Sequence, residues 1–343
     1  MMEAEERPVA DRIEGVPLPP EAETVAGHDA ALQNFLENRD SGRLHHAWLL
    51  SGPRGIGKAT LAFHLAKILL SNAGQGGSDI ETNVHRQVAH GAHPGLLHLT
   101  RPWDEKAKRF KQALSVDEIR KTQQFYGLTS ATGNWRITIV DAADDMNSSA
   151  ANALLKILEE PPKRSLFFVI THSPGRLLPT IRSRCQSLPL SPLDDETVTQ
   201  LLDSFDLETN STRLAKAAKL SGGSVRQALR MLDGDALKAW QAFEKLHGAS
   251  GGAGDWLAVH KLADLLARRG QEQAFTQFTE MVCNWIADRA RQHDDRRLTV
   301  LAGWSDVWEK ANRSVRLADA YNLDRKQVIL SLFSDLFAHN SRM

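Results

Sequence analysis

The stretch that decides the fold runs Gly52-Pro53-Arg54-Gly55-Ile56-Gly57-Lys58-Ala59-Thr60. Its glycine and lysine spacing is that of a phosphate-binding loop, whose backbone N–H groups and lysine hold phosphate oxygens. The apolar run 47–50 precedes this loop, and apolar residues recur at helical spacing over 61–69. Because strand, glycine-rich loop and helix form the context that such a loop needs, these residues predict a nucleotide-binding core.

Two features of the loop and its surroundings argue against efficient ATP hydrolysis. Ala59 stands where a Ser or Thr hydroxyl would bind magnesium, and Thr60 lies about 100° further around the helix. A predicted buried strand over 136–140 leads into Asp141, which either faces magnesium or its water shell or acts as a turn or helix-cap residue. Ala142 follows where many such enzymes place a water-activating Glu. We therefore expect little or no hydrolysis, while binding of ATP or ADP stays open.

The remainder of the chain up to about residue 190 alternates between predicted strands and helices. A helix over 152–159 ends at a pair of prolines, and a second buried strand covers 166–171. Such alternation implies a parallel sheet with helices on both faces. Asp144 and Asp145 lie close behind the first of these strands, and we expect neither to reach back and replace the missing Glu.

From about Ser191 the sequence predicts helices alone. Three short helices are expected, at 197–202, 211–220 and 225–232. Long helices follow a Gly- and Ser-rich segment at 248–254, and two apolar stripes run along them, from Phe275 to Ile286 and from Leu301 to Val315. The stripes predict a helical core. Their large aromatic side chains also allow part of this surface to pack on sister subunits.

The bulk composition limits the class of protein. The chain has 343 residues, a formal net charge of zero and 42% hydrophobic residues, which suffices for two or three packed domains. A protein that binds nucleic acid by itself is usually basic, so we expect any DNA contact to be shared with partners or confined to one patch. Cys185 and Cys283 match no zinc spacing or disulfide framework and are expected as free thiols in the cytoplasm. We expect neither a signal peptide nor a membrane span.

Further residues are candidates for a functional site. His85, His90 and His93 form a patch whose intervals fit no metal site, so we expect a solvated loop there. Arg184 comes after the second buried strand, and arginine can stabilise charge on a phosphoryl group, including one held by another subunit. Arg226 begins a predicted helix and could meet a phosphate from that side. Taken alone, each of these patterns is weak, and a surface arginine is the default interpretation.

The order of these pieces resembles one protein family. The chain reads His45-His46-Ala47-Trp48-Leu49-Leu50 before the loop, then Ala151-Asn152-Ala153-Leu154-Leu155-Lys156 running into Glu159-Glu160-Pro161-Pro162, then Ser183-Arg184-Cys185 and Gly223-Ser224-Val225-Arg226. With this order, from about Val25 to Leu336, the chain resembles the AAA+ clamp loader subunits of bacterial DNA polymerase III, and most closely their delta-prime family.

The resemblance implies a fold and a set of partners. Behind a flexible arm at 1–24 it implies a RecA-like AAA+ core at 25–190, a small helical lid at 191–234 and a helical collar domain at 235–343. The collar would join motor and delta subunits in a hetero-pentamer that uses ATP to place the sliding clamp on primed DNA. Such an assembly is cytoplasmic and has no membrane contact.

Site residues are implied in the same way. Arg184 matches the arginine finger that acts in trans on a neighbour's ATP, Arg226 matches a second sensor, and Thr171 or His172 lies where the first sensor sits. The implied nucleotide-binding set is Gly52, Pro53, Arg54, Gly55, Ile56, Gly57, Lys58, Ala59, Thr60, Asp141, Thr171 and Arg226.

Two departures from the family pattern bear on cofactors. Many relatives carry a four-cysteine zinc module where Asn83 to Pro94 here has no cysteine, so we expect no zinc. Delta-prime members often have a loop unfit for hydrolysis, whereas this chain keeps a near-complete glycine frame and Lys58, so ATP or ADP occupancy stays open. Besides a non-catalytic subunit, two alternatives remain. One is an ATP-hydrolysing motor subunit of the same loader, and the other is a free-standing DNA-binding AAA+ ATPase, which the neutral charge disfavours.

Overall fold

A computed structural model describes residues 12–13, 15–71, 78–127, 135–248, 255–292, 298–321 and 323–340. The chain divides into two compact units, one of Met1–Ser211 with Ser221–Arg226 and one of Thr212–Leu220 with Gln227–Met343. Much of the expected arm at 1–24 and nearly all of the Gly-rich segment at 248–254 lie outside the described residues. The boundaries expected for core, lid and collar stay a prediction.

The first unit is built on a five-stranded parallel sheet with the strand order β2-β5-β6-β1-β7. Its strands are β1 (Ala47–Ser51), β2 (Leu96–Leu99), β5 (Arg136–Val140), β6 (Ser165–Thr171) and β7 (Gln186–Pro189). In register, Leu49 of β1 lies opposite Val169 of β6 and Ser187 of β7. Since all five strands run the same way, the loops that follow them share one edge, here called the carboxyl edge. The residues that precede them share the opposite amino edge.

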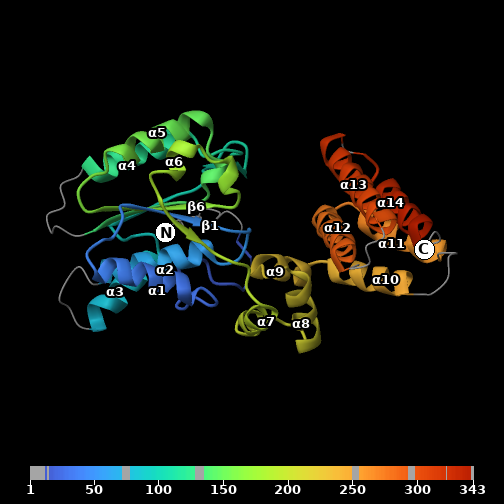
Figure 1. Cartoon of the computed structure of the whole chain (residues 1–343). Coiled ribbons are helices and arrows are strands. Elements are labelled where there is room, and N and C mark those ends of the chain that lie inside the picture. The colour runs from blue at the N-terminus through green and yellow to red at the C-terminus, as the bar shows by residue number, and fades with distance from the viewer. Residues whose placement is uncertain are drawn as a thin grey trace. The chain divides into compact units, whose positions relative to one another are not determined.

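Helices cover both faces of this sheet, with α1, α2 and α3 on one face and α4, α5 and α6 on the other (Figure 1). Their bounds are α1 (Asp29–Asp40), α2 (Lys58–Ser71), α3 (Ser78–Ala89), α4 (Val116–Gly127), α5 (Ser148–Glu159) and α6 (Pro179–Arg182). Side chains of β1 alternate between the two layers: Trp48 and Leu50 join the core shared with α1 and α2, whereas Leu49 joins the core shared with α5. Burial on both faces explains why the central strands β1, β5 and β6 are mostly apolar, whereas the edge strands β2 and β7 are less buried.

Shorter elements complete the first unit. They are the antiparallel pair β3 (Trp103–Asp104) and β4 (Arg109–Phe110), the 3-10 turns η1 (Ala143–Asp145) and η2 (Pro174–Arg176), and α7 (Asp195–Asp203). Asn147 caps α5, because its side-chain oxygen accepts a hydrogen bond from Ala150 N. The five-stranded sheet and the helices on its two faces confirm the predicted parallel sheet covered on both sides.

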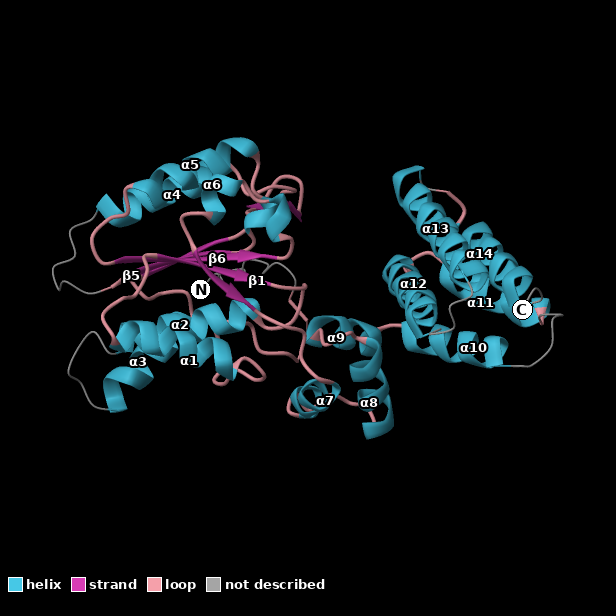
Figure 2. Cartoon of the chain, in the orientation of Figure 1, coloured by secondary structure: helices cyan, strands magenta, loops and turns pink. Residues whose placement is uncertain are grey.

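The described parts of the second unit are helical (Figure 2). The helices that follow α7 are α8 (Ser211–Leu220), α9 (Val225–Asp233), α10 (Ala236–Gly248), α11 (Trp256–Ala267), α12 (Glu272–Gln292), α13 (Leu298–Tyr321) and α14 (Arg325–Asn340). The ring of Phe243 in α10 lies 5.3 Å from that of Trp285 in α12 and 5.8 Å from that of Phe333 in α14. The stripe from Phe275 to Ile286 therefore forms core, as predicted. On α13, Trp304 is buried but Trp308 is 43% exposed.

The expectation of a solvated loop around the three histidines is wrong in part. Helix α3 continues to Ala89 and includes His85, because Val84 and Val88, four residues apart, pack against the core beside α2. His93 is half-buried and its Nδ1 accepts a hydrogen bond from Gly95 N at 3.0 Å. Burial lowers the pKa of His93. The structure describes no group of three or more His, Cys, Asp and Glu side chains arranged to hold a metal.

Two other expectations concern thiols and membranes. Cys185 and Cys283 are free, and burial raises the pKa of their thiols to about 12 and about 11. Such thiols stay protonated and unreactive at neutral pH. Among the helices in the described ranges, none combines the length and apolar character needed to cross a bilayer.

Candidate nucleotide site and the edge opposite to it

The phosphate-binding loop joins β1 to α2 at the carboxyl edge of the sheet. Gly55 and Gly57 have φ of 79° and 97°, a region that L side chains rarely adopt, so glycine is required for this path. Lys58 is 3% exposed, and its Nζ donates hydrogen bonds to Gly52 O at 2.7 Å and to Pro53 O. The ammonium group is thus folded back onto the carbonyls of its own loop. To bind the Lys58 ammonium, a phosphate would have to replace these hydrogen bonds to the loop carbonyls.

The pKa of Lys58 depends on its burial in the loop and on the charged side chains nearby. Burial lowers its pKa to about 8, although the carboxylates of Asp141 and Asp144 act in the opposite direction and Arg54 adds to the decrease. Desolvation disfavours the charged form of a lysine, and nearby anions favour it. Bound phosphate would therefore restore the full charge of Lys58. The loop keeps the cationic chemistry that a nucleotide needs.

The remaining loop positions contribute little that could bind magnesium. Ala59 packs against the core beneath α2, and its methyl group offers no oxygen. Ile56 is fully buried, whereas Pro53 and Arg54 are exposed. Thr60 is half-buried on α2, one position past the place of the missing hydroxyl.

The backbone of Arg226 lies at the phosphate-binding loop, and its sensor role stays a prediction. Its backbone N–H donates to Gly55 O at 3.4 Å. A Cβ on Gly55 would lie 2.3 Å from Ser224 Oγ and 2.7 Å from Arg226 Cβ. The 223–226 turn therefore packs directly on the loop, although the two segments lie about 170 positions apart in sequence.

His28 also supports the loop, and sequence reasoning missed it. Its ring Nε2 lies 2.7 Å from Ile56 O, and since a carbonyl can only accept, this nitrogen carries the proton. His28 is 5% exposed and directly precedes α1. A single histidine before a helix gives no pattern that would have indicated this contact.

Acidic residues gather where β5 and β6 end. Asp141 follows β5, and its Oδ2 lies 3.7 Å from His98 Nε2. Asp144 accepts hydrogen bonds from Thr171 Oγ1 at 3.1 Å, from His172 N at 2.7 Å and from Ser173 N at 3.0 Å. Asp144 thus fixes the predicted first-sensor segment at the end of β6. Sequence reasoning considered Asp144 only as a replacement base and missed this role.

These contacts limit the chemistry available to the acidic residues that follow β5. Burial, followed by the charge of Lys58, lowers the pKa of His172 to about 4, so its ring is neutral at physiological pH. Asp145 pairs with Arg101, with Nε and Oδ2 3.2 Å apart. Ala142 is buried and carries no carboxylate. Asp144 and Asp145 are thus both engaged with other groups, and Ala142 cannot activate water.

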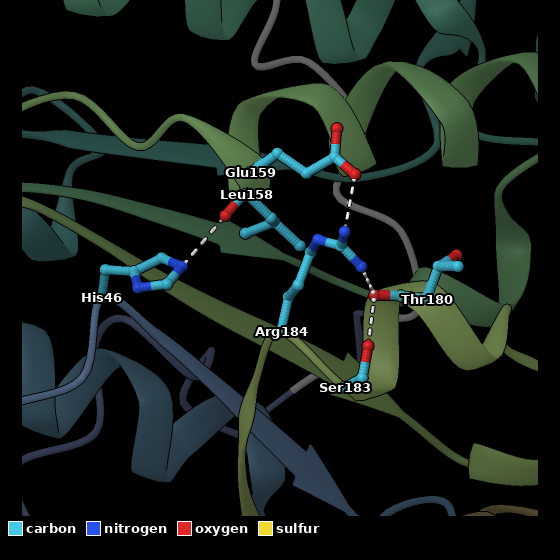
Figure 3. Close-up of polar contacts among 6 residues, drawn as sticks. All are labelled: His46, Leu158, Glu159, Thr180, Ser183 and Arg184. Carbon is cyan, nitrogen blue, oxygen red and sulfur yellow. Dashed lines mark hydrogen bonds and ion pairs between the residues drawn. The ribbon is translucent and has the colours of Figure 1, made fainter.

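Arg184 lies elsewhere, in the loop between α6 and β7 (Figure 3). Its Nη2 lies 2.8 Å from Glu159 Oε1 and its Nη1 donates to Thr180 O at 3.0 Å. Nearby, His46 Nε2 donates to Leu158 O at 3.1 Å. The side chain of Arg184 is 35% exposed, so the guanidinium is held in place but stays accessible.

The position of Arg184 in the sheet determines which phosphates it can reach. Arg184 precedes β7, Glu159 precedes β6 and His46 precedes β1, so all three lie at the amino edge. The phosphate-binding loop leaves β1 at the carboxyl edge. A strand of five residues rises roughly 16 Å at about 3.3 Å per residue, which separates Arg184 from its own loop by more than the length of an arginine side chain.

Comparison with known proteins shows which family the chain resembles. A family model described as "DNA polymerase III, delta subunit" matches residues 27–194. The chain is 32% identical over 254 residues to DNA polymerase III subunit delta' of Escherichia coli, covering 71% of this chain and 69% of that protein. It is 38% identical over 191 residues to the delta' subunit of Pseudomonas aeruginosa, covering 54% and 55%. It is also 30% identical over 234 residues to subunit tau of Escherichia coli, covering 65% and 35%.

The order of motifs, the parallel sheet with its phosphate-binding loop and the extent of the match to delta' subunits all lead to the same assignment. The chain belongs to the delta-prime family of bacterial DNA polymerase III clamp loader subunits.

Proposed function

We propose that this subunit hydrolyses no ATP itself and instead supplies Arg184 to the ATP site of a neighbouring subunit. The observation that carries the proposal is the location of Arg184 at the amino edge, opposite the chain's own phosphate-binding loop. A guanidinium held there can stabilise a transferring phosphoryl group only if another subunit brings the nucleotide to it.

The proposed assembly is a hetero-pentamer with motor and delta subunits that loads the sliding clamp on primed DNA in the cytoplasm. The chain's own site supports a non-catalytic role within it. Ala59 cannot ligate magnesium through its side chain, and Ala142 cannot activate water. Any ATP or ADP held by Lys58 and Arg226 would then act as a structural ligand rather than as a substrate.

The test of this proposal is to mix the purified chain with candidate motor and delta subunits and to measure the native mass of the product. We expect a stable hetero-oligomer, together with no phosphate release by the isolated chain in magnesium and ATP. A chain that stays monomeric in every mixture would contradict the assembly. Steady phosphate release by the isolated chain that is lost in Lys58→Ala would favour the motor subunit instead.

Glu159 provides a second, finer prediction for the assembled loader. The Glu159–Arg184 pair holds the guanidinium in one place, and an exposed pair of this kind contributes up to about 1 kcal/mol. If that energy orients Arg184 in the transition state, Glu159→Gln should lower the rate of ATP hydrolysis by up to about five-fold. Single-turnover ATP hydrolysis by the reconstituted complex measures this effect.

A double-mutant cycle separates positioning from a general change in structure. Glu159→Gln should have no further effect once Arg184 is alanine, because Glu159 is expected to act only through the guanidinium. The neighbouring Glu160→Gln, also exposed, is the matched control and should leave the rate unchanged. An equal loss from Glu159→Gln in both backgrounds would contradict a positioning role.

A further inference from the structure

The chain has no net charge, yet one short segment is strongly basic. Residues 101–111, Arg-Pro-Trp-Asp-Glu-Lys-Ala-Lys-Arg-Phe-Lys, contain five Lys and Arg against two Asp and Glu, a net charge of +3. Lys106, Lys108, Arg109 and Lys111 are exposed. Local concentration of positive charge matters more than net charge for binding a polyanion, because the interaction is screened within about 10 Å at moderate salt.

This segment, here called the basic hairpin, has a defined structure. Trp103–Asp104 pairs antiparallel with Arg109–Phe110, and the rings of Trp103 and Phe110 meet edge to face with centroids 5.0 Å apart. Asp104 Oδ1 accepts hydrogen bonds from the backbone N–H groups of Lys106 and Ala107, each at 3.0 Å. The turn between the strands is therefore held from within, which lowers the entropy cost of presenting its cations to a partner.

The hairpin's own acids neutralise only part of this positive charge. The carboxylate of Asp104 accepts the turn's N–H groups, which lower its pKa together with the nearby charges of Lys111 and Arg109. Glu105 Oε2 lies 3.9 Å from Lys108 Nζ, and both side chains are largely exposed, so this pair is weak. The cations at the tip therefore keep most of their charge for another molecule.

The basic hairpin stands at the carboxyl edge of the sheet. It follows β2, and its base is tied down by the Arg101–Asp145 ion pair at 3.2 Å and by a hydrogen bond from Lys111 N to Pro102 O at 2.9 Å. Asp145 closes η1 directly behind β5. The hairpin is thus built into the edge that carries the phosphate-binding loop, opposite the edge that carries Arg184.

The chemistry of the hairpin suits a polyanion. Three of its four exposed cations are lysines, which bind phosphate as compact point charges and need no planar two-point fit. Phosphate contacts of this kind need no particular base sequence. For a member of a DNA polymerase III subunit family, DNA is the polyanion to which this chemistry applies.

We propose that the basic hairpin, residues 101–111, binds the phosphate backbone of DNA without sequence preference. The contact goes beyond the trans action of Arg184 and does not depend on it, because it lies at the opposite edge and needs no nucleotide. With only a few cations, the binding is weak in the isolated chain. A dissociation constant of about 10⁻⁴ to 10⁻⁶ M is typical of non-specific binding.

The test measures binding of the isolated full-length chain to fluorescein-labelled primed DNA by anisotropy over a series of salt concentrations. We expect the double variant Lys106→Gln with Arg109→Gln to bind roughly ten- to a hundred-fold more weakly at about 50 mM salt. Its slope of log K against log salt should be smaller by about two, one for each lost phosphate contact.

A second double variant is matched in charge and in residue types. Arg43→Gln with Lys163→Gln removes one Arg and one Lys that are exposed and precede β1 and β6, at the amino edge. This variant should bind DNA as the wild type does, and unchanged circular dichroism should show that both variants are folded. Equal weakening in the two variants, or no binding by the wild type even at low salt, would overturn the proposal.

Polyglutamate serves as the competing probe for an acidic protein partner. Loss of polyglutamate binding in the hairpin variant, with DNA binding unchanged, would overturn the proposal in favour of an acidic polypeptide. The readout needs neither the loader nor ATP. Failure here therefore leaves the role of Arg184 untouched, and failure of the Arg184 experiment leaves this one standing.

Discussion

Replacing Arg184 with alanine should slow ATP hydrolysis at the neighbouring subunit's site by roughly 10³-fold, the lower end of the effect of an arginine supplied in trans. The guanidinium would stabilise charge that develops on the phosphoryl oxygens, and alanine offers no replacement donor. Assembly should survive, because the pair with Glu159 is half-exposed and contributes little to folding. Single-turnover hydrolysis by the reconstituted complex measures the loss, and native mass checks assembly.

Arg182→Ala is the matched control for this experiment. Arg182 ends α6, two positions before Arg184, is exposed and donates to Pro174 O at 3.3 Å. Losing it removes the same charge from the same part of the chain, so turnover should stay near the wild-type value. Unchanged turnover with Arg184→Ala, or an equal loss with both variants, would contradict the trans role of Arg184.

Gly223→Ala should destabilise the first unit by about 3 kcal/mol. Gly223 has a φ of 79°, which costs an L residue roughly 1–2 kcal/mol. Its added Cβ would also lie 2.4 Å from Leu193 O and 2.7 Å from Leu193 N, which are backbone atoms that cannot rotate away. Relief of such overpacking typically costs a further 1–3 kcal/mol. Urea unfolding followed by circular dichroism measures the change in free energy.

The adjacent Gly222→Ala separates backbone strain from the steric clash. Gly222 also has a positive φ, 59°, but a Cβ added to it meets nothing within 4 Å. Its cost should therefore be about 1–2 kcal/mol, the strain alone. If both variants lost the same stability, close packing of Gly223 on Pro192 and Leu193 would not explain the result.

Local patterns were sufficient to predict the elements of the sheet. The strand predicted at 136–140 matches β5 at both ends, because a run of β-branched residues bounded by polar ones leaves little ambiguity. The helix predicted at 152–159 begins earlier, at Ser148, because Asn147 caps it and the small residues 148–151 carry no periodic signal. Helix α3 was missed although Ile80, Val84 and Val88 recur every four residues, because only polar residues and histidine fill the positions between them.

Some features of the candidate site could also be predicted from local sequence, whereas others depend on contacts between distant residues. The phosphate-binding loop and the absence of a hydroxyl at Ala59 are properties of consecutive residues, so spacing alone revealed them. The roles of His28 and Asp144 depend on contacts to Ile56 and to 171–173, which are 27 or more positions away. No local pattern encodes such contacts.

The sequence by itself determined the class of fold, the alanines at positions 59 and 142 of the candidate site, and the family, because each rests on residue types at fixed spacing. Only the tertiary structure decided that Arg184 and the phosphate-binding loop lie at opposite edges of one sheet, and that the basic hairpin shares the loop's edge. The physical reason is the parallel pairing of β1, β6 and β7, which sends every loop that follows a strand to one edge and every residue that precedes a strand to the other.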